Sequence, residues 1–217
     1  MHIVWKGQAC FQITASISKE EKVNIVIDPF DESIGLRVPN LEAQILLSTH
    51  DHRDHNNIKA ASGEYFLIKG PGEYERKEVF VRGIPSYHDS EGGAKRGPNT
   101  IYTIKAEDLV LCHLGDIGQK ELSPEQIDEI GSVDVLMVPV GGVFTVDGKE
   151  AAHIVSQIEP SIVIPIHYKI PKLKIGLEGP DKFLKAMGAK SLLPEPKLII
   201  KKKDIQEEET KVVLLEP

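Results

Sequence analysis

The first half of the 217-residue chain has the pattern of β-strands. Short segments in which apolar residues alternate with polar ones, or run together, are separated by turn-forming glycine, proline, asparagine and aspartate. The run at 44–49 contains three consecutive apolar residues, Ile45, Leu46 and Leu47, and predicts a buried strand. The strands predicted in this half span residues 2–5, 9–15, 22–28, 44–49, 64–68, 78–87, 99–105 and 108–113.

The second half alternates helical segments with apolar strands. The segment Ser123-Pro124-Glu125-Gln126 supplies an N-cap residue, a proline at the first helical position and an acidic first turn, so a helix is predicted to begin there. A second helix is predicted with Ala152, Val155 and Ile158 on one side. The predicted elements are helices from 124, at 148–158 and at 180–187, strands at 133–140, 162–166, 197–201 and 211–216, and a solvated hairpin turn at 206–209.

A strand-rich half followed by β-α-β-α units predicts an α/β protein. Strands that are apolar on both faces need cover on both sides. We therefore expect a four-layer αβ/βα sandwich of two mixed β-sheets with helices on the outer faces. The length suits one domain, so residues 1–217 are expected to form a single unit.

Composition, charge and cysteine content limit the classes of partner and the cellular location that we expect for the protein. The net charge of −7 disfavours a nucleic-acid partner, because phosphate binding needs a basic surface. No run approaches the ~18 apolar residues of a membrane-spanning helix, and no secretory signal is visible, so we expect no membrane partner and a cytoplasmic location. Cys10 and Cys112 lie in apolar runs and are expected to be buried reduced thiols, with a disulfide between them as the alternative.

The segment His50-Asp51-His52-Arg53-Asp54-His55 directly follows the buried run at 44–49. Positions two apart share a side of an extended chain but not of a helix, so His50 and His52 can bind one ion where a strand leaves its sheet. Imidazole and carboxylate suit zinc, iron or manganese. Four donors in six residues exceed the need of one tetrahedral ion. We expect two neighbouring ions, one bound by His50 and His52 and the other by Asp54 and His55; an exposed, metal-free loop is the alternative.

The segment Thr49–His55 matches the T-H-x-H-x-D-H signature, and the whole chain resembles the metallo-β-lactamase superfamily. The resemblance is strongest to its small zinc-dependent hydrolases and weaker to the ascorbate-phosphate lactonases. It implies a first metal bound by His50, His52 and His88, a second bound by Asp54, His55 and His167, and Asp116 bridging the two.

Three candidate catalytic residues complete the site, two of them implied by the same resemblance. Asp54 would orient the nucleophile and accept its proton, and Asp28 would support the histidine segment without binding metal. His113, three residues before Asp116, either orients a metal ligand or is a core histidine bound to the backbone.

The ligand set predicts a hydrolase with two divalent ions, zinc first and manganese or iron as alternatives. Two such ions lower the pKa of a bridging water and polarise the bond under attack. We expect a small anionic, or phosphorylated, substrate with an ester, lactone or phosphodiester bond. Lys95, Arg96 and Lys169 would form a basic rim or remain solvated surface residues, and Tyr168 would bind substrate or pack. A mono-iron oxygenase and a non-catalytic metal-binding module are the alternative functions.

Overall fold

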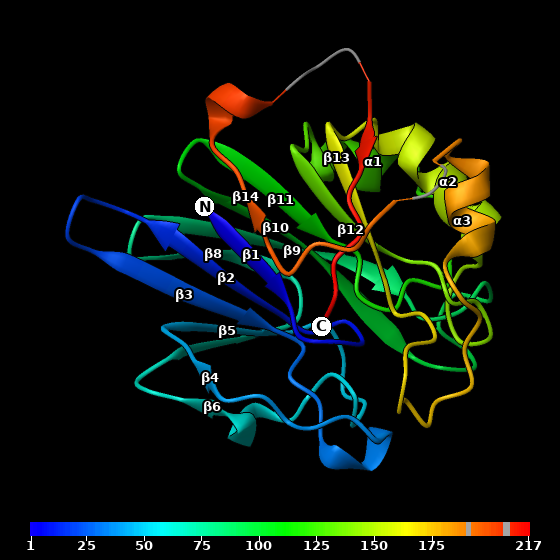
Figure 1. The fold of residues 1–217 in the computed structure, drawn as a ribbon, viewed down its shortest axis with the longest axis horizontal. Helices are drawn as coiled ribbons and strands as arrows, with labels where there is room; N and C mark the ends of the chain where they lie inside the picture. Colours follow the sequence, from blue (N-terminus) through cyan, green and yellow to red (C-terminus); the bar gives the residue numbers. More distant parts are fainter. Residues whose placement is uncertain (190–191, 206–208) are drawn as a thin grey trace.

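Two large mixed β-sheets form the centre of the computed structural model, which describes residues 1–189, 192–205 and 209–217 (Figure 1). The first sheet has the order β14-β1-β2-β3-β5-β7, with β1 at His2–Trp5, β2 at Phe11–Ser16, β3 at Lys22–Ile27, β5 at Ile45–Ser48, β7 at Phe66–Lys69 and β14 at Leu198–Ile199. The second has the order β15-β13-β12-β11-β10-β9-β8, with β8 at Gly72–Arg76, β9 at Val79–Tyr87, β10 at Pro98–Ala106, β11 at Leu109–His113, β12 at Val135–Pro139, β13 at Ile162–Ile166 and β15 at Lys211–Val212. A small sheet pairs β4 (Leu41–Glu42) with β6 (Ala61–Ser62).

Alternating apolar side chains hold the two large sheets together. In β3, Ile25 and Ile27 belong to the cluster that also contains the buried residues of the second sheet. Val26 lies between them in sequence and belongs to a separate cluster on the opposite face. Strand β5 repeats this alternation, with Leu46 in the second cluster. A register slip of one residue would exchange the two faces, so the pairing of β3 with β5 is strongly specified.

The helices α1 (Pro124–Ile130), α2 (Gly148–Ile158) and α3 (Asp181–Ala186) lie together beside the second sheet (Figure 1). Helix α1 contacts β9 and α2 contacts β12. Helix α1 begins where predicted, with a reciprocal pair of hydrogen bonds between Ser123 and Gln126. In α2 the fully buried side chains include Ile154 and Val155, while Ala152 and Ile158 are partly buried.

The outer face of the first sheet is covered by the segment that joins β3 to β5. Phe30, Ile34 and Leu41 of this segment pack on Val26 and Leu46. The segment contains a short 3-10 helix at Glu32–Ile34. The architecture therefore agrees with the predicted two mixed sheets, and this outer face of the described chain is covered by an irregular segment with one 3-10 turn.

The structure also refines the expected strands and thiols. Strand β8 was not predicted, because most of its side chains are polar and exposed at the edge of the second sheet. The predicted strands at 197–201 and 211–216 shorten to β14 and β15. The predicted turn at 206–209 falls mostly outside the described residues. Cys10 and Cys112 are buried and free.

The direction of the strands brings distant parts of the chain to one edge. Strands β3 and β5 run parallel, as do β11, β12 and β13, and β9 shares the direction of β11 because both pair antiparallel with β10. Ligand sites of layered α/β proteins form where carboxyl ends of parallel strands meet. The residues that follow these ends are Asp28, the segment 50–55, His88, Asp116 and His167. No helix in the described part of the chain is long and apolar enough to cross a membrane.

Candidate metal centre

The seven histidine and aspartate side chains that the sequence predicted as ligands converge at this edge in two groups. The first contains His50, His52 and His88, and the second contains Asp54, His55, Asp116 and His167. Within each group the potential ligand atoms lie within 4.8 Å of one another. The segments that follow β5, β9, β11 and β13 therefore supply two adjacent clusters of metal-binding side chains.

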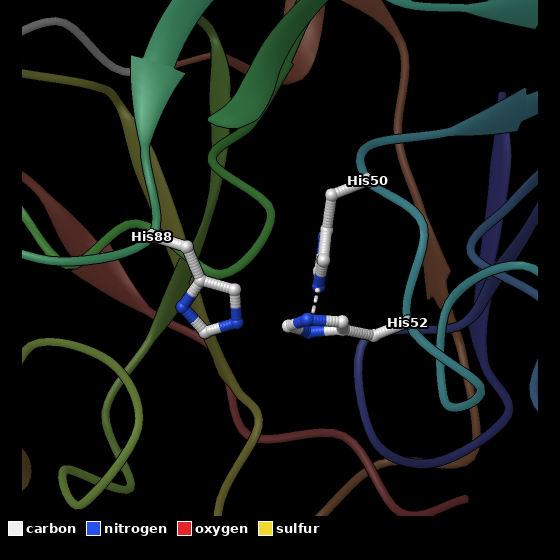
Figure 2. Close-up of side chains that lie close together, drawn as sticks. All are labelled: His50, His52 and His88. Atoms are coloured by element: carbon white, nitrogen blue, oxygen red, sulfur yellow. Dashed lines mark hydrogen bonds between the residues drawn. The ribbon is translucent and has the colours of Figure 1, made fainter. Parts of the chain in front are cut away.

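The first group is a cluster of imidazoles. His50 Nε2 lies 3.1 Å from His52 Nδ1, and the His88 ring faces this pair from the end of β9 (Figure 2). Burial and then the positive charge of His55 lower the pKa of His50 to about 2. Burial also lowers the pKa of His52. Both rings are thus neutral near pH 7, which is the form that binds metal.

Asp116 joins the two groups through one oxygen. Its Oδ2 atom lies 3.3 Å from Nε2 of His88 in the first group. The same oxygen lies 3.2 Å from Nε2 of His55 and 3.1 Å from Nε2 of His167 in the second group. A carboxylate in this position can bridge two ions.

A tight turn holds Asp116 in place. The backbone N–H of Asp116 donates to Asn99 Oδ1 at 3.0 Å. Gly115 has a φ of +58°, and a Cβ at this position would lie 2.3 Å from Asn99 Oδ1, so the turn requires glycine. His113 Nδ1 accepts the Gly115 N–H at 3.0 Å, and its Nε2 donates to the Ala9 carbonyl at 2.9 Å. His113 is therefore a buried ring that contacts backbone on both sides.

Asp28 fixes the start of the histidine segment through hydrogen bonds to Thr49. Its Oδ1 accepts the Thr49 N–H at 2.8 Å, and its Oδ2 accepts the Thr49 hydroxyl at 2.7 Å. Its Oδ2 also lies 2.8 Å from Nδ1 of His55, which places the ring hydrogen on Nδ1 and leaves Nε2 to face Asp116. Asp28 itself belongs to neither ligand group.

Gln8 is a residue of the site that the sequence analysis missed. Its Nε2 donates to Asp54 Oδ2 at 2.9 Å, and its backbone carbonyl accepts the His167 N–H at 3.0 Å. It is fully buried and has a φ of +54° in the turn after β1. The only local signal is the preceding glycine, Gly7, which marks the turn but not its contact with Asp54.

The second group combines positively charged imidazoles with negatively charged carboxylates. Burial alone would lower the pKa of His55 and His167, but nearby carboxylates, Asp116 foremost, raise the pKa of His167 to about 9 and that of His55 well above its usual value. Burial alone would raise the pKa of Asp54 and Asp116, but the neighbouring imidazoles outweigh it and lower both. The group is thus a buried site where carboxylates attract positive charge.

The donor spacing and the unpaired atoms fit divalent metal ions. Two donors bound to one zinc at ~2.0–2.1 Å and a tetrahedral angle lie about 3.3–3.4 Å apart. The donor pairs His50–His52, His55–Asp116 and His167–Asp116 are separated by 3.1, 3.2 and 3.1 Å. His55 Nε2 and Asp116 Oδ1 are buried without a hydrogen-bond partner, a state that is costly unless another group binds there.

The residues expected to form a basic rim or to bind substrate lie in different surroundings. Tyr168 is buried, and its ring centroid lies 5.1 Å from that of Trp5, so it packs. Lys95 forms an ion pair with Glu91. Lys169 is exposed. Arg96 lines the cavity that opens on the two groups.

Two mixed sheets that present paired histidine and aspartate groups at their strand ends define a metallohydrolase scaffold, and comparison with known proteins agrees. Residues 2–167 match the model of the β-lactamase superfamily domain. The chain belongs to the metallo-β-lactamase superfamily.

Curated and solved relatives give the activity class. A metal-dependent hydrolase of the UPF0173 group from Pyrobaculum islandicum is 31% identical over 84% of this chain and 90% of its own length. A crystal structure of a proposed Zn-dependent hydrolase of the metallo-β-lactamase superfamily from Thermotoga maritima is 33% identical, with a TM-score of 0.79 and 99% of both chains covered. The protein is a metal-dependent hydrolase.

A more distant match shows the fold alone. The diiron β-hydroxylase from Streptomyces venezuelae is 13% identical, with a TM-score of 0.56 over 76% of this chain and 44% of that one. Because one scaffold carries several chemistries, the reaction of this chain has to be argued from its own site.

Proposed function

We propose that the protein hydrolyses an ester, lactone or phosphodiester bond of a small anionic substrate at a dinuclear metal centre. The observation that carries this proposal is the position of Asp116 Oδ2, within 3.3 Å of imidazoles from both ligand groups. One ion would be held by His50, His52 and His88, the other by Asp54, His55 and His167, and both by Asp116. Zinc suits this donor set, and manganese and iron share its ligand preferences.

Two bound divalent ions would supply an acidified water and a Lewis acid for the bond under attack. Asp54 is ionised, because neighbouring imidazoles lower its pKa, and it can therefore accept a proton from the attacking water. The Gln8 amide fixes Asp54 Oδ2 through a 2.9 Å hydrogen bond. Asp28 and His113 act through other residues: Asp28 orients the His55 ring, and His113 supports the turn that carries Asp116.

The cavity over the two groups has room for a small molecule. Its volume is about 250 Å³, and its lining combines ligand residues with Arg96, Phe144 and Ile175. One cationic side chain among apolar ones favours an anionic substrate. The two buried free thiols are in keeping with the reducing cytoplasm, where we expect the enzyme to act.

The proposal is tested by loading the protein with zinc, manganese or iron and assaying 4-nitrophenyl acetate, a γ-lactone and bis(4-nitrophenyl) phosphate. We expect metal-dependent hydrolysis of at least one of these, and a roughly 10²- to 10⁴-fold fall in kcat in Asp54→Asn. Asp128→Asn is the matched control, because Asp128 is exposed on α1 and belongs to neither ligand group. Absence of metal-dependent turnover on all three substrates, or full activity of Asp54→Asn, would contradict the proposal.

A further inference from the structure

Arg96 lies where two cavities meet beside the metal centre. The first is the cavity of about 250 Å³ over the ligand groups. The second, of about 360 Å³, shares His52 and Arg96 with the first. Most of the exposed surface of the second cavity is apolar, with Pro71, Pro85 and Pro98 among its lining residues. Its other cation, Lys69, pairs with Asp51 at 3.5 Å. His52 and Arg96 therefore border both cavities, and a molecule that extends from one cavity into the other lies next to both side chains.

The backbone of Arg96 is held by the residue that follows a metal ligand. Asp89 comes directly after His88, and its carboxylate accepts four backbone N–H groups. The Asp89 Oδ1 atom accepts from Glu91 at 2.8 Å and Gly93 at 3.0 Å, and Oδ2 from Lys95 at 2.9 Å and Arg96 at 2.8 Å. Bonds from backbone donors to one carboxylate order a loop strongly. The loop from Asp89 to Arg96 is thus built onto the ligand His88.

The side chain of Arg96 is held by an aromatic ring. Its guanidinium carbon lies 4.7 Å from the centroid of the Phe144 ring, within cation–π range. Phe144 follows Val143, an exposed β-branched residue with a φ of +61°. This backbone conformation is unfavourable for valine, and such strain is retained where the surroundings impose it. The stacked guanidinium keeps its in-plane N–H donors free for a ligand.

The charge of Arg96 is not neutralised by a neighbour. Within residues 1–189, 192–205 and 209–217, no carboxylate lies at ion-pair distance from its guanidinium. Lys95, its neighbour in sequence, pairs with Glu91 instead. Neither Lys95 nor Lys169 contributes to the lining of the two cavities. Of the expected basic rim, Arg96 alone is therefore both unpaired among the described residues and turned toward these cavities.

We propose that Arg96 is the specificity-determining residue of the site and binds a carboxylate or phosphate group of the substrate. The substrate class is then an anionic ester or phosphodiester with an apolar group: the anion lies on Arg96 and the apolar group in the proline-lined cavity. The placement of the reacting bond at the metal centre rests on the proposed function, whereas the contact between Arg96 and the anion does not.

Calorimetric binding of non-reacting probes to the metal-loaded protein tests this contact. The probes are phenyl phosphate and phenylacetate, with inorganic phosphate and benzyl alcohol as partial ligands. Arg96→Gln is expected to weaken the binding of one or both aromatic anions by roughly 10- to 100-fold, which is the effect of losing a hydrogen bond to a charged group. Whichever anion loses more affinity identifies the preferred group. Direct binding of a probe to the metal ions is common to all variants, so it cancels in the ratio of the variant Kd to the wild-type Kd.

The matched control is Lys95→Gln, which removes the same charge from the next residue and is expected to change anion affinity less than about threefold. Arg96→Lys keeps the charge but not the two-pronged guanidinium, and is expected to fall between wild type and Arg96→Gln. Phenyl phosphate is expected to bind more tightly than inorganic phosphate, because its ring enters the apolar cavity. Metal content and circular dichroism are measured on each variant, so that a folding defect is recognised.

The two proposals fail in different ways. If Arg96→Gln affects the anions no more than Lys95→Gln does, or weakens benzyl alcohol equally, the role of Arg96 is overturned whatever the activity of the enzyme. If wild type shows no metal-dependent hydrolysis but Arg96→Gln still loses affinity for one of the anions, the proposed function fails and the anion contact stands.

Discussion

The carboxylate of Asp28 and the ring of His55 form a buried pair, with Asp28 Oδ2 2.8 Å from His55 Nδ1. The pair determines which ring nitrogen of His55 faces the rest of the site. With a hydrogen on Nδ1, His55 turns Nε2 toward Asp116, 3.2 Å away, and Nε2 is the atom that would bind a metal ion. A carboxylate behind a histidine in this way fixes the ring and raises its basicity toward a metal.

Asp28→Asn is expected to weaken binding of one of the two ions by roughly 10- to 100-fold, because the amide supports the His55 ring less well and removes the charge behind it. The measurement is competition for zinc with a chromogenic chelator. Asp128→Asn, on the exposed side of α1, is the control and is expected to bind like wild type. Equal affinity of Asp28→Asn and Asp128→Asn would show that Asp28 does not support the ligand.

Gln8→Met removes the donor to Asp54 while keeping most of the side-chain volume. Loss of a hydrogen bond to a carboxylate of the site is expected to lower kcat/KM by roughly tenfold or more, with little change in KM. The check is steady-state kinetics together with metal content. Gln12→Met, on the half-buried strand β2, is the matched control. If both variants keep wild-type kcat, Gln8 has no part in positioning Asp54.

Asp147 gives a prediction about stability and pH. It caps α2, accepting the N–H groups of Lys149 at 2.8 Å and Glu150 at 3.0 Å, and the bond from Glu150 is the main cause of its lowered pKa. A carboxyl group with a depressed pKa in the folded state stabilises the fold above its unfolded pKa, 3.8, and loses this contribution as the pH falls through its folded value.

Asp147→Ala is therefore expected to lower the free energy of unfolding by about 1 kcal/mol at pH 7. The difference between wild type and variant should shrink as the pH is lowered below 4. Urea unfolding at a series of pH values measures it, with Asp128→Ala as a control that lacks a capping role. A difference that stays constant down to pH 3 would contradict the assigned cause.

Local signals in the sequence predicted what depends on neighbours along the chain. The runs that became β3 and β5 are apolar enough to identify buried strands, and the capping residue Ser123 marks the start of α1. The histidine segment after β5 is itself a local motif. The rest of the ligand set, His88, Asp116 and His167, was predicted from the resemblance to the metallo-β-lactamase superfamily and not from local signals.

Contacts between distant segments could not be predicted in this way. Gln8 reaches Asp54 because the turn after β1 folds over the histidine segment. The two readings of His113 differed only in its partners, and the Ala9 carbonyl that binds it lies 104 residues away. The stacking of Arg96 on Phe144 joins loops that follow β9 and β12. No periodicity or spacing encodes such pairs.

Metal content per chain tests the central claim, a dinuclear centre joined by Asp116, most directly. Elemental analysis of protein reconstituted with zinc is expected to find about two ions per chain in wild type. His50→Ala and His167→Ala, which each remove one ligand from a different group, are expected to retain about one ion. One ion in wild type, a single iron, or no bound metal after reconstitution would contradict the dinuclear account.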